Sequence, residues 1–475
     1  MKPLQIVITG GGPSATFFLA RALMAVQSGL LKAESITILD PRVPSWGGTP
    51  HSTRSTSLRV NMRLNLHNFP GNHIGFEAFL AQIGATAFDP PLRADLGLYT
   101  RHVAENTIAQ LRSLGCNVRQ VPFAATAVHP IGNAPGYVVR DADGGTWPGT
   151  HVILATGHQS PSLPAAFATV DPAKVSYYDG GTSFATRISP NDRVLVIGTG
   201  PGAIDVARCL VEEHGVETTV NLRSRQGLLS AVQTPDPVPE VLVQEVATIL
   251  AGLERSRIAP TLELLATSLA PLMRRVDARW ELAHFIGHAT SVDPLAQLSE
   301  DIAAAEQGGP AYRQVVEAIG SHASRIWRWL GPVQQERFMK ERDGIFQRLY
   351  YVKRHAQLAG TAIWLRDRMV EGRVTVGSTT TSLPEFDRLV VATGPEYRVA
   401  RTTNPLIRQM LASALARPSR TPSGHELGGL WTRDFQLATA PGIFAMGSLA
   451  RGEDFAVHGY PSLDKHAKAI VAQLR

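Results

Sequence analysis

Two glycine-rich turns are the features of this sequence whose residue types and spacing most directly suggest chemistry. In the first, Gly10, Gly12 and Ala15 follow the apolar run LQIVIT and precede the helical pattern ATFFLARALMAV. The first glycine permits a tight turn, the second lets the backbone approach a phosphate, and the small Ala15 lets a helix pack on a strand. With Pro13 and Ser14 between them, these residues predict a strand–turn–helix site for a pyrophosphate, which we call the first cradle.

The residues after the first cradle indicate what kind of molecule it holds. The next strand pattern, SITILD, ends on Asp40, and an acidic side chain there can accept a hydrogen bond from a ribose hydroxyl. The loop beyond it contains Trp46 and His51 on either side of Gly47 and Gly48, and adjacent glycines let the backbone approach a flat ligand. We therefore expect a dinucleotide with a free ribose in the first cradle.

A second turn of the same kind follows the apolar run RVLVIG near the middle of the chain. Its residues, which we call the second cradle, include Gly198, Gly200, Pro201, Gly202 and Ala203. A glycine motif of this type is weak evidence when it stands alone. Here each motif lies between a strand pattern and a helical pattern, which is the context that dinucleotide binding requires.

The strand after the second cradle ends on basic residues instead of an acid. It closes with Arg223, Ser224 and Arg225. An acid would repel a ribose 2′-phosphate, whereas arginine and serine bind one through charge-assisted hydrogen bonds. The second cradle should therefore prefer NADPH to NADH, although these arginines could also be ordinary surface charge.

Each cradle also has a partner motif far along the chain. A buried-strand pattern that ends in Thr156 and Gly157 closes the first half, and one that ends in Thr393 and Gly394 closes the second. Both read ATG. The sequence is thus a pseudo-repeat of cradle, strands and ATG turn, and the duplication strengthens the interpretation of each half.

The paired cradles and ATG turns resemble the flavoproteins with two dinucleotide-binding domains, in which FAD lies on the first cradle and NAD(P)H on the second. The C-terminal stretch APGIFAMGSLARG resembles their closing FAD motif, with Gly447 in place and Ser448 where an aspartate is usual. The stretches WGGTPHST and LRVNMRLN look like a subgroup of the class B flavin monooxygenases related to N-hydroxylating and urate-hydroxylase-type enzymes. Disulfide reductases of the superfamily need a CxxC motif, which this sequence lacks.

The resemblance implies an α/β fold with two Rossmann-like dinucleotide-binding domains. Residues 1–187 and 401–475 should form a discontinuous FAD-binding domain, and residues 188–400 an NADPH-binding domain. Between about 236 and 365, apolar residues recur at helical spacing, which predicts a helical insertion in the second domain. The insertion could supply walls of a substrate pocket or a face for a homo-oligomer.

The resemblance also points to residues near the chemistry. In the family, an asparagine at the position of Asn61 lies beside the flavin and NADP⁺, with Met62 next to it; Asn61 could otherwise make only a turn hydrogen bond. His458 and Tyr460 lie where the closing motif passes the flavin ring, so they could shape a substrate pocket or only brace the last helix. Arg354 could bind an anionic substrate or the NADP phosphate, or bond carbonyl groups at a helix end.

The implied activity is that of a monooxygenase dependent on FAD and NADPH. Such an enzyme activates O2 as a C4a-(hydro)peroxyflavin and hydroxylates a small polar metabolite. N-hydroxylation of an amine is the first expectation. The alternatives are C-hydroxylation of a nitrogen heterocycle, as in urate hydroxylases, and NADPH:acceptor reductase or oxidase activity without oxygenation. The signature of Baeyer–Villiger enzymes is missing, so ketone oxygenation is not expected.

Composition excludes several other classes of protein. With 475 residues, of which 44% are hydrophobic and 18% charged, the chain fits two ordinary globular domains. Its net charge of +6 comes from scattered residues, so we expect no nucleic-acid partner. The 2 cysteines and 15 histidines show no metal-ligand spacing, and no apolar run is long enough for a membrane span. With no recognisable leader, we expect a cytoplasmic protein without a metal.

Overall fold

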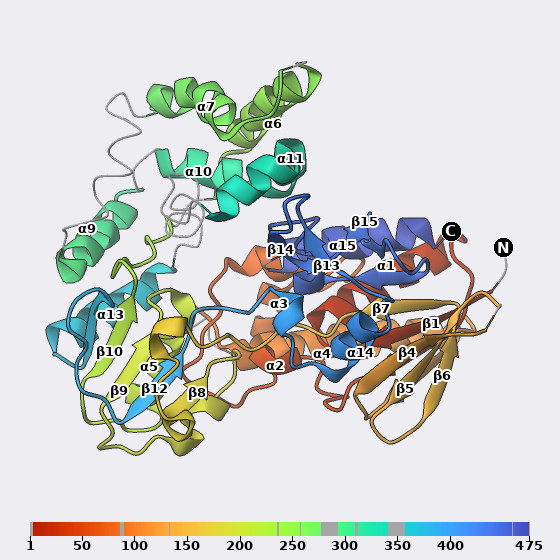
Figure 1. Ribbon diagram of the computed structural model, residues 1–475, viewed down its shortest axis with the longest axis horizontal. Helices are drawn as coiled ribbons and strands as arrows, with labels where there is room; N and C mark the ends of the chain where they lie inside the picture. The colour runs from red at the N-terminus through yellow and green to blue at the C-terminus, as the bar shows by residue number, and fades with distance from the viewer. Residues whose placement is uncertain are drawn as a thin grey trace.

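The computed structural model shows two bodies, each built on a parallel sheet, and a layer of helices stacked over them (Figure 1). It describes residues 3–85, 90–132, 134–234, 237–256, 258–276, 293–308, 312–340, 357–457 and 459–474. The chain starts in the larger sheet, passes through the smaller sheet and the helical layer, and returns to the larger sheet. The first and last segments of the sequence are therefore neighbours.

The larger sheet carries the first cradle. Its strands are arranged in the order β15-β16-β17-β7-β1-β2-β3, and those from β17 to β3 run parallel. They are β1 (Leu4–Thr9), β2 (Ala33–Leu39), β3 (Asn117–Val121), β7 (His151–Leu154), β15 (Thr432–Arg433), β16 (Gln436–Leu437) and β17 (Ile443–Ala445). The last four residues of β1 are buried, which is why Ile6, Val7 and Ile8 form an unbroken apolar run instead of alternating with polar residues.

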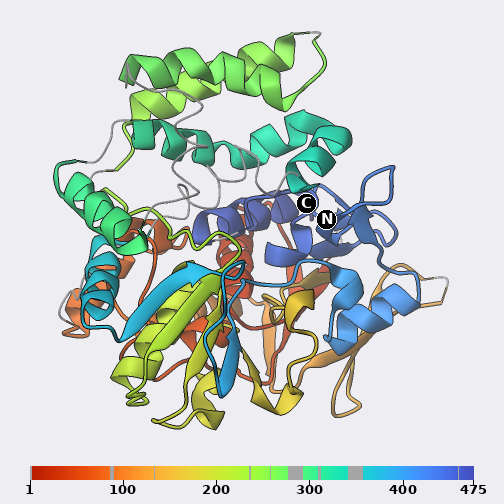
Figure 2. The ribbon, with the colours of Figure 1, turned by 60° about the vertical axis from the view of Figure 1, so that its left-hand side comes forward.

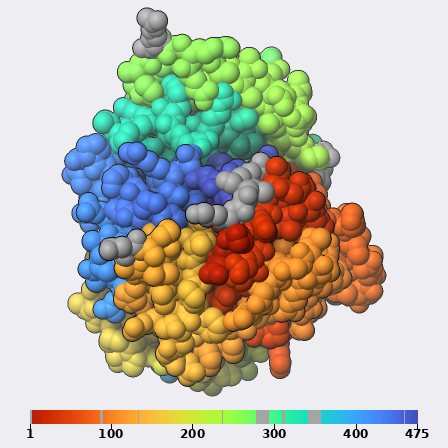
Figure 3. Space-filling view, turned by 90° about the vertical axis from the view of Figure 1, so that its right-hand side faces the viewer, coloured from red at the N-terminus to blue at the C-terminus, as the bar shows by residue number. Residues whose placement is uncertain are grey.

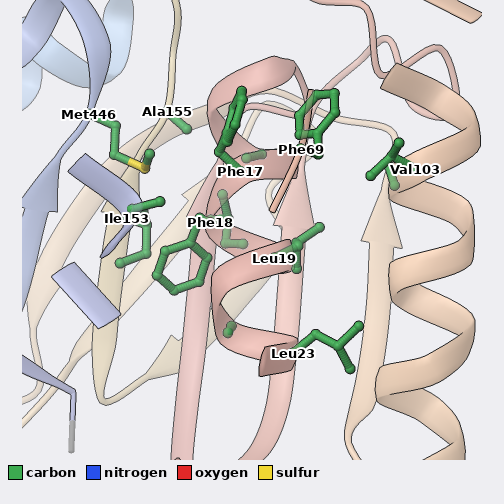
Figure 4. Packing of buried hydrophobic residues seen from close by; sticks show 14 of the residues in the cluster. Phe17, Phe18, Leu19, Leu23, Phe69, Val103, Ile153, Ala155 and Met446 are labelled. Carbon is green, nitrogen blue, oxygen red and sulfur yellow. The ribbon is translucent and has the colours of Figure 1, made fainter. Parts of the chain in front are cut away.

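Three helices pack side by side on this sheet: α1 (Pro13–Gln27), α4 (Arg93–Ser113) and α15 (Tyr460–Gln473). Helix α1 is the central one and is apolar on most sides. In Figure 4, Phe18 lies on the side of Ile153 of β7 and Leu23 on the side of Val103 of α4. This core holds the start of α1, and with it the first cradle, in a fixed position.

Smaller elements surround the larger sheet. The strands β4, β5 and β6 form an antiparallel sheet, and β13 pairs with β14. These elements are β4 (Ala125–Pro130), β5 (Tyr137–Asp141), β6 (Thr146–Gly149), β13 (Pro418–Arg420), β14 (Glu426–Leu430), α2 (Gly48–His51), η1 (Leu64–His67), α3 (Phe76–Gln82), η6 (Val399–Arg401), α14 (Pro405–Ala412) and η7 (Gly447–Ala450).

The smaller sheet carries the second cradle and has the order β11-β10-β9-β12-β8, all parallel. Its strands and the helices near it are β8 (Val175–Tyr177), β9 (Val194–Ile197), β10 (Val220–Ser224), β11 (Val374–Ser378), β12 (Arg388–Val391), α5 (Pro201–Glu212), α9 (Pro294–Glu306), α13 (Ala359–Val370), η2 (Ala165–Phe167), η3 (Pro172–Lys174) and η4 (Ser183–Arg187). Because β8 pairs with β12, the domain boundary expected at residue 187 cuts through this sheet. We propose that the second domain begins before Val175.

The helical layer consists of α6 (Glu240–Arg255), α7 (Leu262–Val276), α10 (Tyr312–Ser321) and α11 (Ala323–Lys340), and it lies over both sheets (Figure 2). Its apolar side chains pack together with Leu427 and Phe455 of the C-terminal segment. In the space-filling view the C-terminal segment, coloured blue, lies directly beneath the helical layer, coloured green to teal (Figure 3). Helices α9 and α13 instead pack against the smaller sheet. No helix in the described ranges is long and apolar enough to cross a membrane.

Candidate functional site

The first cradle is a turn that only glycine can make. Gly10 has a φ of +114°, and a Cβ there would lie 2.2 Å from the carbonyl oxygen of Ala155. Gly12 is the N-cap of α1; no side chain caps this end, and the first turn has no acidic residue. The first helical residues are Pro13, Ser14 and Ala15. The uncapped N–H groups and the positive end of the helix dipole can therefore bind an anionic phosphate.

Asp40 holds the backbone of this turn through hydrogen bonds. Its buried carboxylate accepts hydrogen bonds from the backbone N–H groups of Gly11 and Arg42, both at 2.7 Å. Both carboxylate oxygens are thus used to hold the backbone around the cradle. A bond from Asp40 to a ribose hydroxyl stays a prediction: Oδ1 also accepts from Nε of Arg42 at 3.5 Å, whereas Oδ2 keeps a second lone pair.

The loop after Asp40 folds back against the cradle. A Cβ on Gly12 would lie 3.3 Å from the Cα of Gly48, so the two backbones nearly touch, and Gly47 is the N-cap of the short helix α2. Trp46 is fully buried with a φ of +55°, and its indole N–H has no partner in the described part of the chain. The glycine at position 48 therefore lets this loop lie directly against the cradle; an approach of the loop backbone to a flat ligand stays a prediction.

His51 ends α2 close to the first cradle. Burial, followed by the charge on Arg93, lowers the pKa of its imidazole to about 3. The ring is therefore neutral at physiological pH. Its Nδ1 atom is buried without a hydrogen-bond partner among the described residues. A neutral histidine in this place can exchange a hydrogen bond with a ligand without adding charge.

The second cradle repeats the construction of the first. Gly198 has a φ of +136°, and a Cβ there would lie 2.4 Å from the carbonyl oxygen of Ala392. Gly200 is the uncapped N-cap of α5, which starts at Pro201, and the first turn again has no acidic residue. A Cβ on Gly202 would lie 3.1 Å from the Tyr178 ring. In both halves, then, the carbonyl of the alanine that begins the ATG motif packs on the first glycine of the cradle.

The ATG turns themselves lie beside the cradles. Thr156 and Gly157 follow Ala155 directly, and the exposed Thr393 and Gly394 follow Ala392. Both glycines have positive φ, +78° at Gly157 and +85° at Gly394. The pairing of cradle and ATG turn that the sequence predicts is therefore present in three dimensions.

The basic strand end after the second cradle is only partly available to a phosphate. The Ser224 hydroxyl accepts hydrogen bonds from Thr199 Oγ1 and the Gly227 N–H, both at 3.0 Å, and so holds the local turn. Arg225 is exposed, and Arg223 is half-buried with no partner at its Nε atom among the described residues. The two arginines remain candidates for binding a 2′-phosphate.

The closing motif is held by residues that the sequence analysis did not select. The Gly447 N–H donates to Nδ1 of His466 at 3.1 Å, and Nε2 of His466 lies 3.1 Å from the Asp454 carboxylate. Burial alone would raise the pKa of Asp454, but its contacts with His466 and Lys465 lower it. Ser448, at the position of the usual aspartate, donates to the carbonyl of Gly157 at 2.8 Å. Ser448 thus ties the closing motif to the first ATG turn.

Two of the candidate catalytic residues, His458 and Arg354, lie outside the described residues. A third, Tyr460, is 5% exposed and packs against the rings of Phe17 and Phe69. Its hydroxyl lies 3.0 Å from Thr100 Oγ1, and burial raises its pKa. This geometry favours the second of the expected roles, bracing the last helix.

Asn61 lies where the two bodies meet. Its side chain lies close enough to Asp205 of α5 to lower the pKa of that carboxyl, against the larger raising effect of burial. Its backbone carbonyl accepts a hydrogen bond from Gln233 at 3.5 Å. The next residue, Met62, reaches the start of α15, because a Cβ on Gly459 would lie 2.8 Å from its sulfur. The loop at Asn61 therefore connects the last helix of the larger body to the second cradle.

Asp205 belongs to a buried polar network that the sequence analysis missed. It forms an ion pair with Arg93 at the start of α4, and the Tyr178 hydroxyl donates to it at 3.1 Å. Burial opposes the charge on Arg93, but Asp205 and Tyr178 outweigh it and raise the Arg93 pKa. A second contact lies nearby, where Glu213 accepts from Ser55 Oγ at 2.6 Å. These contacts fix the two cradles relative to each other.

The arrangement of the two sheets with their matched cradles is similar to that of solved flavin monooxygenases. Residues 7–159 match the FAD-NAD(P)-binding family, about a third of the chain. No curated protein matches the sequence.

The similarity in fold to several solved structures covers nearly the whole chain. Ornithine hydroxylase (PvdA) from Pseudomonas aeruginosa is 15% identical, with 99% of this chain and 98% of that chain covered and a TM-score of 0.55. L-lysine 6-monooxygenase from Pseudomonas syringae is 16% identical, with the same coverage and a TM-score of 0.50. A mutant flavin monooxygenase from Stenotrophomonas maltophilia is 14% identical, with 100% and 98% covered and a TM-score of 0.50. At these identities the likeness is one of fold.

Proposed function

We propose that the protein is an FAD- and NADPH-dependent monooxygenase that hydroxylates a small polar metabolite, with FAD on the first cradle and NADPH on the second. The observation that carries this proposal is the matched pair of cradles. In each, the first glycine, Gly10 or Gly198, packs on the carbonyl of an ATG alanine, and the turn leads into a helix whose N-terminus no side chain caps. One cradle would suffice for a simple nucleotide-binding protein. Two cradles fixed relative to each other suit a reaction in which one cofactor reduces the other.

The residues present fit both cofactors. Backbone N–H groups at the starts of α1 and α5 would bind the two pyrophosphates. Arg223 and Arg225 would bind the 2′-phosphate of NADPH. The buried and unpartnered Nε1 of Trp46, Nδ1 of His51 and Oδ1 of Asn61 are polar atoms that a ligand would satisfy. When bound, the flavin would supply hydride acceptance and O2 activation, and the role of the chain is to bind, orient and exclude water.

N-hydroxylation of an amine is the reaction we favour. The structures named as ornithine hydroxylase and L-lysine 6-monooxygenase share the fold over nearly the full length of this chain. C-hydroxylation of a nitrogen heterocycle is the second candidate, and NADPH oxidation without oxygenation of a substrate is the third. The neutral His51 beside the first cradle suits a site that must stay free of extra charge.

A coupling experiment separates these reactions. NADPH consumption, hydrogen peroxide and hydroxylated product are measured with the FAD-loaded protein and panels of primary amines and nitrogen heterocycles. The proposal predicts that at least one amine yields product in near-stoichiometric amount with NADPH and suppresses peroxide. Product from heterocycles alone supports the second candidate. Peroxide equal to NADPH with every compound would contradict the monooxygenase proposal.

A further inference from the structure

His466 of α15 accepts a hydrogen bond from the backbone of the closing motif. Its Nδ1 atom lies 3.1 Å from the nitrogen of Gly447, and a backbone N–H group can only donate. The ring proton must therefore lie on Nε2, which is 3.1 Å from the carboxylate of Asp454 and donates to it. A neutral imidazole with its proton on Nε2 is the one form of His466 that makes both bonds.

The surroundings of His466 keep its ring in this orientation. The side chains of His466 and Asp454 are buried, and the Phe435 ring lies with its centroid 4.4 Å from that of the imidazole. Lys465 donates to the same carboxylate oxygen of Asp454 at 2.7 Å and helps to keep the pKa of that carboxyl below its usual value, against the effect of burial. The Asp454 anion requires a donor at Nε2, so it selects the tautomer whose Nδ1 accepts from Gly447.

The Gly447 peptide that His466 holds lies beside the first cradle. Gly447 has a φ of +61°, and a Cβ there would lie 3.6 Å from the hydroxyl oxygen of Ser14 at the start of α1. The next residue, Ser448, donates to the carbonyl of Gly157 in the first ATG turn at 2.8 Å. Consecutive residues of the closing motif are thus bonded to the last helix and to the ATG turn, next to the helix N-terminus where a pyrophosphate would bind.

We propose that His466, oriented by Asp454, is a positioning residue for FAD. It holds the Gly447 peptide against the first cradle, so that the closing motif and the start of α1 form one binding surface before the cofactor arrives. The inference rests on the proposed function, which assigns FAD to this cradle. Because a preorganised surface loses less conformational entropy on binding, the hydrogen bond at Gly447 increases the affinity for FAD. Both buried side chains act through the backbone of Gly447 without contacting the cofactor.

The dissociation constant for FAD tests this inference. It is measured by diluting the FAD-loaded protein and following the fluorescence of the released flavin. His466→Leu removes the acceptor but keeps a side chain of similar size, and it should weaken FAD binding on the order of tenfold. His466→Asn places an amide oxygen near the position of Nδ1 and should stay within about threefold of the wild type. A histidine that only contributes to packing would stabilise the protein equally with and without FAD, and would leave the dissociation constant unchanged.

A His466→Leu protein with the wild-type dissociation constant would overturn the inference. So would a His466→Asn protein as weak as His466→Leu, because the acceptor would then not be the cause.

Asp454→Ala tests whether the carboxylate acts through His466. Alone it should weaken FAD binding by about threefold, because the tautomer is no longer selected. Added to His466→Leu it should cause no further loss, and additive losses would contradict the role given to Asp454. If His466→Leu does not fold, Asp454→Ala replaces it, and a wild-type dissociation constant in that variant would overturn the inference.

Asp464→Ala is the matched control, because Asp464 lies on the same helix as His466. Its carboxylate accepts from Nε and Nη2 of Arg21 on α1, at 2.7 and 2.6 Å. The change loosens the contact between α15 and α1 without touching His466, and it should leave the dissociation constant within about twofold of the wild type. A loss equal to that of His466→Leu would show that any loosening of α15 releases FAD, and would overturn the inference. A wild type that folds but binds no FAD would instead contradict the proposed function, so the two failures are distinguishable.

Discussion

Arg223 lies across β11 in a space that exists only because residue 377 is a glycine. A Cβ on Gly377 would lie 1.6 Å from Nη1 of Arg223, and the two residues are paired in neighbouring strands. The sequence predicts a phosphate-binding role for Arg223 and Arg225 from their place at the end of a strand. It gives no sign that Gly377, 154 positions later, decides where the guanidinium lies.

We expect Gly377→Ala to raise the KM for NADPH by roughly five- to tenfold and to leave that for NADH nearly unchanged, because the displaced Arg223 loses its charge-assisted contact with the 2′-phosphate. Steady-state kinetics with both cofactors measure this. Gly252→Ala is the control, since a Cβ there meets no atom within 4 Å. Equal losses with NADPH and NADH would show that Arg223 does not bind the 2′-phosphate.

The buried side chain of His67 makes the free energy of unfolding depend on pH. It is 2% exposed, its Nδ1 lies 3.0 Å from the Arg63 carbonyl, and burial lowers its pKa to about 4. The unfolded chain takes up a proton below pH 6.5, whereas the folded chain does so only near pH 4. Stability from this residue is therefore complete above pH 6.5 and is lost as the pH falls towards 4, by about 2 kcal/mol at pH 5.

Urea unfolding at pH 7.5 and pH 5 checks this expectation. Between the two pH values, wild type should lose about 2 kcal/mol more unfolding free energy than His67→Gln. His129→Gln, which changes an exposed histidine, should retain the wild-type dependence. An identical pH dependence in wild type and His67→Gln would contradict the assignment.

At the scale of elements, α11 packs the helical layer against the C-terminal segment. The Trp327 ring stacks on Phe455 with centroids 4.8 Å apart, and its Nε1 donates to the carbonyl of Gly452 at 3.0 Å. The Arg451 guanidinium lies 3.9 Å from the centroid of Tyr397 and 4.2 Å from that of Phe455. Helical spacing predicts that Trp327 is a core residue, but it does not reveal that the partner is the segment carrying the closing motif.

Trp327→Leu should lower the unfolding free energy by about 3 kcal/mol, because it removes ring stacking and leaves a cavity. Hydrogen exchange should become faster in α11 and in residues 450–457, while exchange in β1 and α1 stays slow. Trp329→Leu is the matched control, because Trp329 is only partly buried and should cost clearly less. Uniformly faster exchange throughout the chain would show that the Trp327 contact stabilises the whole protein and not α11 and residues 450–457 in particular.

Element boundaries were predictable only where a pattern was long. The runs that became β1 and α1 are mostly apolar and are separated by a glycine-rich turn, so both elements and the turn between them followed from the sequence. β8 has only three residues and no distinctive pattern, so the sequence does not show that it pairs with β12, the pairing on which we base the proposed earlier start of the second domain. The sequence could not choose between the two roles expected for Tyr460, because its aromatic neighbours Phe17 and Phe69 come from residues far away in sequence.

At the scale of the whole molecule, the internal repeat is the property that the sequence predicts best. Gly10 with Ala155 and Gly198 with Ala392 make the same contact in two halves of one chain. The contacts that join the halves could not be predicted, since pairs such as Ser55 with Glu213 are 158 residues apart and neither partner belongs to a motif. The positions of the cofactor sites thus follow from local patterns, whereas their relative orientation depends on the folded structure.

Reoxidation of the NADPH-reduced protein by O2 tests the central claim most directly. The flavin absorbance is followed by stopped flow with NADP⁺ present and after its removal. A monooxygenase whose two cradles are fixed relative to each other should reoxidise markedly more slowly with NADP⁺ bound, because the nucleotide excludes water from the flavin. Reoxidation at the same fast rate in both cases, with one hydrogen peroxide released per NADPH whatever amine is added, would contradict the account.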